Sequence, residues 1–240
     1  MAPGAPGVLV LAGKRGAVRV KSREDILGGS FLRMVQASGG VIPITPDEDL
    51  RTGQAAALAS APDSVRGGGD AWVFGYGSLM WNPAIRYQES RIAMVRGYHR
   101  RFCLWSPVGR GCAVHPGLVL GLTRGGSCKG VAYRIKGCEV AEEFSILWQR
   151  EMISDGYIPR WIRLHTAEEP LDALTFVINR ACPRYAGRLP DEEAARAIAA
   201  ARGALGSNTE YLLSTVEHLD ALGIPDRRLH SLKRRLLECP

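Results

Sequence analysis

Apolar residues in the middle of the chain come in short runs that glycine and proline interrupt. Valine, leucine, isoleucine and aromatic residues dominate these runs, which is typical of β-strands. The runs cover residues 72–74, 92–105, 118–122, 130–135, 161–164 and 174–178. Turns are predicted at Pro116 and Gly117, and again at Gly125 and Gly126. The pattern therefore predicts a segment rich in β-sheet between residues 70 and 178.

Helical patterns stand on either side of these strands and once among them. A helix over residues 46–61 is predicted because Thr45 can cap it and Pro46 suits its first position. Glu48, three residues after the cap, can complete a capping box. A helix over residues 140–152 interrupts the strands.

The last third of the chain is predicted to be helical. One helix opens at Pro190 and Asp191. The next is capped by Asn208 and ends at Gly223, and a basic amphipathic helix covers residues 226–238. Strands clustered first and helices after them indicate an α+β fold rather than a doubly wound one.

The chain divides at about residue 70. Residues 1–70 are predicted to form an N-terminal extension that is partly flexible, with the helix at 46–61 as its ordered part. Residues 1–23 are rich in glycine and proline, and residues 60–70 have the composition of a linker. Residues 71–240 are predicted to form the main domain, which is long enough to bury a core of its own.

Hydropathy excludes two classes of protein. No apolar run approaches the roughly 20 residues of a membrane helix. The apolar run at residues 8–12 is too short for a signal peptide, and basic residues follow it at once. We therefore predict a cytoplasmic protein with no membrane partner.

The cysteines show no C-x-x-C spacing. In a chain without an export signal they are predicted to be reduced thiols: Cys103, Cys112, Cys128, Cys138, Cys182 and Cys239. A zinc site that combines some of them with His99 or His115 is the alternative, although the irregular spacing disfavours it.

The net charge of +7 is concentrated in the middle of the chain. Residues 71–190 hold 16 basic and 9 acidic side chains, whereas the segments before and after them are nearly balanced. A positive field of this kind attracts an acidic small molecule. Nucleic acid is the alternative partner, but the arginines are scattered and no nucleic-acid fold signature is present. We therefore predict no nucleic-acid partner.

Two glycines flank a tyrosine where the first predicted strand ends. Glycine leaves backbone N–H groups accessible, so this loop can bind an anionic or carbonyl group. The loop consists of Gly75, Tyr76, Gly77, Ser78, Leu79 and Met80. It lacks the third glycine of a dinucleotide motif and the Gly-Lys-Ser/Thr end of a P-loop. It also lacks the glycines that flank the serine of a nucleophile elbow. A plain strand end is the alternative interpretation.

Glu151 stands on the apolar side of the helix predicted over residues 140–152. At about 100° per residue it falls at about 20°, within the stripe of Val140, Phe144 and Leu147. The other polar side chains, which include Glu142, Glu143 and Arg150, fall on the opposite side. A buried carboxylate either pairs with a cation or takes up a proton, as general acids and bases do. The alternatives are a solvated helix end or a structural pair with an arginine such as Arg160.

Several blocks together resemble the ChaC-type γ-glutamylcyclotransferases, a family regarded as specific for glutathione. The resemblance spans about residues 71–222. It rests on residues 74–79, 81–83, 96–102, 116–119, 130–134, 150–151 and 208–212. Many ordered blocks make it far more specific than the two glycines alone.

The resemblance implies a γ-glutamylcyclotransferase-like fold, a small mixed or antiparallel β-barrel with flanking helices, with residues 71–240 as the catalytic domain. It implies an enzyme that cuts glutathione into 5-oxoproline and cysteinylglycine. The loop from Tyr76 to Leu79 would bind the γ-glutamyl group, and Glu151 would be the general base and acid. The substrate's own α-amine can attack its γ-carbonyl, so the reaction needs neither a cofactor nor a metal.

Two further positions are candidates for binding the substrate. Tyr185 lies in a segment that resembles a family Asn-Pro-x-Tyr-x-Gly-Pro element, but Cys182 and Arg188 replace its first and last residues. Its hydroxyl would assist substrate binding, and loop packing is the alternative. Arg100 or Arg101 could face the glycine carboxylate of glutathione, although strand alternation allows only one of them to point inward.

Two other functions stay open at the level of sequence. One is a cyclotransferase for other γ-glutamyl amines. The other is a module that binds γ-glutamyl compounds or glutathione without catalysis. The oligomeric state is expected to be a monomer or a homodimer, and the sequence indicates no function for residues 1–70.

Overall fold

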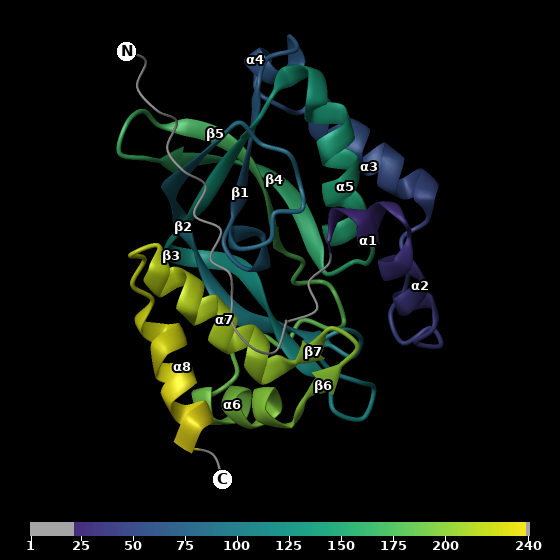
Figure 1. Ribbon diagram of the computed structural model, residues 1–240, viewed down its shortest axis with the longest axis vertical. Coiled ribbons are helices and arrows are strands. Elements are labelled where there is room, and N and C mark those ends of the chain that lie inside the picture. Colours follow the sequence, from purple (N-terminus) through teal and green to yellow (C-terminus); the bar gives the residue numbers. More distant parts are fainter. Residues whose placement is uncertain (1–21, 239–240) are drawn as a thin grey trace.

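The computed structural model describes residues 22–238 and is built around a closed five-stranded barrel (Figure 1). The strands are β1 (Ala71–Gly75), β2 (Glu89–Ser106), β3 (Gly117–Ile135), β4 (Tyr157–His165) and β5 (Leu171–Ile178). Their order around the barrel is β1-β3-β2-β4-β5. Strand β1 pairs with β3 in antiparallel and with β5 in parallel orientation, and the latter pairing closes the barrel. The prediction of a small mixed barrel is confirmed.

The predicted turn at Gly125 and Gly126 is wrong. Strand β3 continues through both glycines, which have φ angles of +101° and +72°. Gly97, with a φ angle of +80°, lies opposite on β2, where the register shifts between Arg96 and Tyr98. Positive φ angles serve bulges as well as turns. These glycines therefore bend a continuous pair of strands instead of ending one.

Helices cover the barrel in two groups (Figure 1). Helices α3 (Asp47–Ala59) and α5 (Val140–Glu151) pack against each other on one side. The second group comprises α6 (Asp191–Ala200), α7 (Asn208–Ala221) and α8 (Arg227–Glu238). The short elements are η1 (Ser78–Met80), η2 (Gly137–Glu139), β6 (Arg202–Gly203) and β7 (Gly206–Ser207). All five long helices begin within one residue of the predicted positions, and the four whose ends were predicted end within two residues of them.

The start of α7 differs from the prediction by one residue. Ser207 is the N-cap, and it forms a capping box with Glu210. Asn208 is the first helical residue, and its buried amide bonds the backbone of Leu118 on β3, accepting from the N–H at 2.5 Å and donating to the carbonyl at 2.8 Å. This side chain therefore fixes α7 to the barrel.

The N-terminal extension contains three short helices that the sequence pattern did not predict. They are α1 (Arg23–Leu27), α2 (Ser30–Gln36) and α4 (Asp63–Arg66), the last within the predicted linker. The predicted flexibility of residues 1–23 falls mostly outside the described residues. Within them, Ser22 caps α1 and Arg23 begins it.

Two further sequence expectations concern thiols and membranes. All five cysteines in the described range 22–238 are free thiols, as predicted. Within the same range, no helix has the length and apolarity needed to cross a membrane.

Candidate active site

The glycine loop folds tightly because β1 ends at Gly75 and η1 begins only three residues later. A Cβ atom on Gly75 would lie 2.8 Å from the Cβ of Leu79 and 3.1 Å from its carbonyl carbon. Side chains below the loop hold its carbonyl groups. Arg100 Nη1 donates to the carbonyl of Tyr76 at 2.6 Å, and the Tyr133 hydroxyl donates to that of Met80 at 2.7 Å.

Three N–H groups of the loop, unlike these carbonyl groups, have no hydrogen-bond partner among the described residues. The amides of Gly77, Ser78 and Leu79 donate to no other group in the described part of the chain. All three residues line a small cavity, the inner lobe, of about 30 Å³. The first N–H groups of a helix have no partner within it. The loop therefore has three backbone donors without an acceptor, on residues that line a cavity.

Glu151, the last residue of α5, lines the same inner lobe. Its side chain is 15% exposed, and its Oε1 accepts a hydrogen bond from Arg150 Nε at 2.8 Å. Arg150 Nη2 also donates to the Ser78 hydroxyl at 3.0 Å, and Nη1 donates to the carbonyl of Asn82. One guanidinium therefore connects the carboxylate on α5 to the glycine loop.

The predicted polar side of α5 is partly wrong. Glu143 is fully buried and Arg150 is 4% exposed, although the helical wheel places both away from the barrel. The glycine loop covers Arg150, and the N-terminal extension covers Glu143. The suggestion of Arg160 as the partner of Glu151 is also wrong, since Arg150 takes that position and Arg160 is exposed.

A larger cavity of about 150 Å³, the outer lobe, adjoins the inner one. Ser78, Glu151, Tyr157 and Tyr211 line both lobes. Burial raises the pKa of Tyr211 to about 12 and that of Tyr157 well above its usual value, so both phenols are protonated at neutral pH. Tyr157 donates to the carbonyl of Leu120 at 2.7 Å.

Besides Arg150, two further arginines line the outer lobe. Arg110 is 6% exposed and lies over the Tyr211 ring at 5.3 Å from its centroid. It forms no ion pair with a carboxylate of residues 22–238, and burial lowers its pKa. Arg184 donates to Ser154 Oγ at 2.9 Å and Asp155 Oδ1 at 3.0 Å, while its Nε is buried without a partner in the described structure. Arg110 is thus buried without a salt bridge among residues 22–238, although Glu210 acts on its charge at longer range, and such a cation suits an anionic ligand.

The polar groups of the remaining candidates have other partners or lie outside the cavity. Tyr76 lines the inner lobe, but its buried hydroxyl donates to the carbonyl of Phe176 at 2.7 Å. Arg100 points below the loop, where its Nε pairs with Asp226 Oδ2 at 3.0 Å. Tyr185 forms an isolated β-bridge with Leu104 but does not line the cavity, whereas Leu104 and Arg184 do.

Sequence reasoning missed four residues of the site. Arg150 was assigned to the polar side of α5, and Tyr211 lies in a block that carried the resemblance but received no role. Tyr157 and Arg110 come from a strand start and a loop, where no motif marks them. Within residues 22–238, no group of three or more metal-ligating side chains lies together.

Known proteins resemble this chain in sequence over most of its length. Residues 71–238 match the ChaC-like protein family. The chain is 42% identical over 179 residues to the glutathione-specific γ-glutamylcyclotransferase of Escherichia coli (strain K12), which covers 74% of this chain and 76% of that protein. It is 39% identical over 177 residues to the glutathione-specific γ-glutamylcyclotransferase 1 of Mus musculus, with 69% and 79% covered.

The fold was compared with solved structures as well. It matches the crystal structure of a γ-glutamylcyclotransferase specific to glutathione from yeast with a TM-score of 0.65 at 22% identity, over 71% of this chain and 96% of that one. The predicted γ-glutamylcyclotransferase-like fold is therefore confirmed. On both sequence and fold, the chain belongs to the ChaC-like protein family, together with these γ-glutamylcyclotransferases.

Proposed function

We propose that this protein degrades glutathione by closing its γ-glutamyl group into 5-oxoproline and releasing cysteinylglycine. Four of the curated relatives, at 38–42% identity, are named as glutathione-specific γ-glutamylcyclotransferases. The observation that supports the proposal most directly is that Glu151 and three free amides of the glycine loop line one cavity. That arrangement supplies both a proton acceptor and hydrogen-bond donors for a carbonyl group.

The reaction takes place within one substrate molecule. The α-amine nitrogen bonds to the γ-carbonyl carbon, and the bond from that carbon to the cysteinyl nitrogen then breaks. The protons that the α-ammonium loses are gained by the leaving nitrogen, so no other reactant is consumed. A five-membered ring closes readily when the reacting atoms are held in position, and such positioning lowers the activation barrier by about 7–11 kcal/mol.

Glu151 relays the proton in this scheme. An ion pair with a guanidinium holds a carboxylate in place, and a carboxylate held beside a bound amine can accept its proton. Arg150 provides this pair and also fixes the distance from the carboxylate to Ser78. The protonated Glu151 then donates to the leaving nitrogen. Arg150 is accordingly assigned as a positioning residue.

The glycine loop stabilises the charge that develops on the γ-carbonyl oxygen. The amides of Gly77, Ser78 and Leu79 have no other acceptor among the described residues. Preformed backbone donors of this kind lower the barrier because they need no reorganisation during the reaction. The γ-glutamyl end is therefore assigned to the inner lobe.

Arg110 binds the glycine carboxylate of glutathione in this proposal. It lines only the outer lobe, where it lies over the Tyr211 ring, and it forms no salt bridge within residues 22–238. The cysteinylglycine part extends past the scissile bond and so reaches the outer lobe. A guanidinium suits a carboxylate there.

The test is release of 5-oxoproline from glutathione by the purified full-length protein, measured beside a panel of other γ-glutamyl dipeptides and amines. The proposal predicts the highest kcat/KM for glutathione. Faster turnover of another γ-glutamyl amine would identify that amine, instead of glutathione, as the preferred substrate. Tight binding of glutathione in calorimetry without any 5-oxoproline would show a binding module instead of an enzyme.

A further inference from the structure

The N-terminal extension forms part of the wall of the outer lobe, although it lies outside the region that matches the family. Apolar side chains from α2 and the loop after it face the cavity that Glu151 lines: Phe31, Met34, Val35 and Ile42. We call residues 22–44 the N-terminal wall. None of its residues lines the inner lobe.

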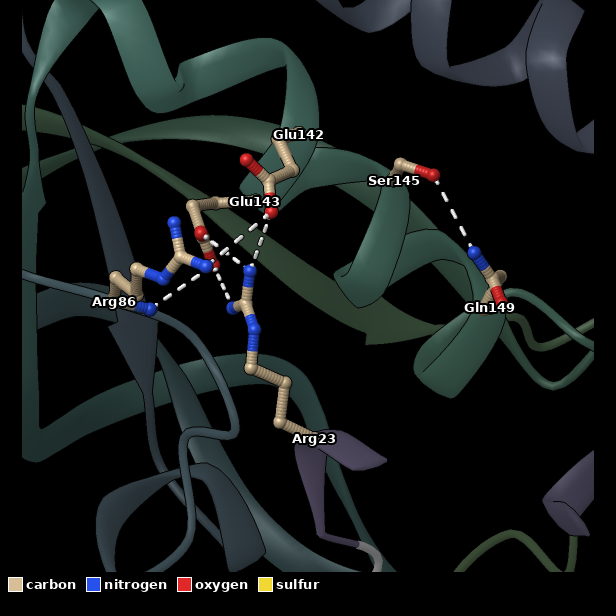
Figure 2. Close-up of polar contacts among 6 residues, drawn as sticks. All are labelled: Arg23, Arg86, Glu142, Glu143, Ser145 and Gln149. Atoms are coloured by element: carbon tan, nitrogen blue, oxygen red, sulfur yellow. Dashed lines mark hydrogen bonds and ion pairs between the residues drawn. The ribbon is translucent and has the colours of Figure 1, made fainter. Parts of the chain in front are cut away.

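A buried ion pair holds the N-terminal wall to the start of α5. Glu143 is fully buried, and it accepts hydrogen bonds from Arg23 at 2.6 and 2.9 Å and from the backbone N–H of Arg86 at 2.9 Å. Arg23 also bonds Glu142 at 2.7 Å (Figure 2). A buried carboxylate is tolerated only when donors satisfy it in this way.

A second anchor lies just past the other end of α5. The N–H of Thr45 donates to the carbonyl of Ile153 at 3.0 Å, and the Ile153 side chain packs with Val35 and Ile42. Glu151 therefore lies between two attachment points of the same segment. The wall has a fixed position relative to the carboxylate.

The division of the cavity indicates which part of the substrate meets the wall. The inner lobe contains the glycine loop, which is assigned to the γ-glutamyl group. Atoms beyond the scissile bond extend into the outer lobe, where Arg110 is assigned to the carboxylate. Phe31 and Met34 line this same lobe with apolar side chains. They are assigned to the cysteine side chain of the leaving group, whose sulfur and methylene need no polar partner.

The wall is thin at one position. A separate cavity of about 360 Å³ lies behind it, between α2, α3 and α5, and Phe31 and Ile153 line both cavities. Leu32 and Leu50 line the rear cavity alone. Truncation of Phe31 would therefore join the two spaces, whereas truncation of Leu32 would enlarge only the rear one.

We infer that Phe31 and Met34 of the N-terminal wall belong to the substrate site and limit the size of the group on the cysteine sulfur. This inference rests on the proposed function. The wall makes the enzyme selective for the free thiol, because a long alkyl group on sulfur would collide with Phe31. The limit comes from residues outside the family-matched region, so it is a property of this chain's own extension.

The test compares glutathione with S-hexylglutathione for the wild type and for Phe31→Ala, Met34→Ala and the matched control Leu32→Ala. Phe31→Ala is expected to raise the ratio of kcat/KM for S-hexylglutathione to that for glutathione by about tenfold or more. Met34→Ala is expected to raise it by a smaller factor, and Leu32→Ala to leave it within about twofold of the wild type.

An unchanged ratio in both Phe31→Ala and Met34→Ala would overturn the inference, and so would an equal rise in Leu32→Ala. If Phe31→Ala does not fold, Phe31→Leu replaces it, with the same direction expected. Failure of the proposed function would look different, since the wild type would then release no 5-oxoproline from glutathione at all.

Discussion

Arg150 Nε lies 2.8 Å from Glu151 Oε1, so two consecutive residues at the end of α5 form an ion pair inside the cavity. Neighbours in sequence point about 100° apart on a helix, and the long arginine side chain spans that angle. The same guanidinium bonds Ser78 on the glycine loop. The carboxylate is thus linked to the loop beside which it is proposed to act.

Arg150→Gln is expected to lower kcat by about 100-fold while KM changes little, because a displaced catalytic group loses rate more than substrate binding. Arg150→Lys is expected to recover part of the loss, since it restores the charge beside Glu151 without the forked hydrogen bonds of the guanidinium. Steady-state kinetics of both variants check this. A loss confined to KM, or no recovery with lysine, would contradict a positioning role.

Arg110→Gln is expected to weaken binding of glutathione by about 10- to 100-fold, the size of a lost hydrogen bond to a charged group. The loss should depend on the substrate's carboxylate. The wild type should therefore prefer glutathione to its C-terminal amide, and Arg110→Gln should not discriminate between the two. The exposed Arg202→Gln is the matched control. A preference that survives in Arg110→Gln would place the carboxylate elsewhere.

Arg23→Gln is expected to loosen the N-terminal wall, because it leaves the carboxylate of Glu143 buried without its cation. Breaking such a pair costs roughly 3–5 kcal/mol. Hydrogen exchange should therefore become faster in α1 and α2, and the double variant Arg23→Gln, Glu143→Gln should recover much of the protection. Arg33→Gln, which removes an exposed arginine on α2, serves as the control. Equal exchange in Arg23→Gln and Arg33→Gln would show that the ion pair does not hold the wall.

Alkaline pH is expected to destabilise the fold through its buried phenols. Burial raises the pKa of Tyr211 from 10 to about 12. Above pH 10 the unfolded chain loses this proton more readily than the folded one, so stability is complete below pH 10 and falls as the pH rises toward 12. The full loss from Tyr211 is roughly 3 kcal/mol.

Urea denaturation of the wild type and Tyr211→Phe at pH 8, 10 and 11 measures this effect. The variant should lose less stability between pH 8 and 11 than the wild type does. Tyr87→Phe, at an exposed tyrosine, should behave like the wild type. Parallel losses in all three proteins would show that Tyr211 is not the group responsible.

The sequence predicted the two parts of the site in which a residue departs from the pattern around it. The glycine loop and the carboxylate on the apolar side of α5 were both predicted, and the structure places them at one cavity. The helical wheel failed for Glu143 and Arg150 because it assumes a single covered side. In the structure the barrel, the glycine loop and the N-terminal wall all contact α5.

Other parts of the site depend on tertiary contacts that no local pattern records. The glycines at 125 and 126 have positive φ angles, which are compatible with a turn or a bulge, and only strand pairing decides between them. Arg110 and Tyr157 reach the cavity from separate elements without a motif. The N-terminal wall was unpredictable for the same reason, since α1 and α2 are too short for a helical period to be detected.

The most direct test of the account is the rate of 5-oxoproline release from glutathione by wild type and Glu151→Gln, with Glu217→Gln as a control at an exposed acid. Loss of a general base and acid lowers kcat by about 100- to 10,000-fold. The account predicts a loss in that range for Glu151→Gln, with glutathione binding and thermal stability retained, and no loss for Glu217→Gln. A Glu151→Gln variant as fast as the wild type would contradict it.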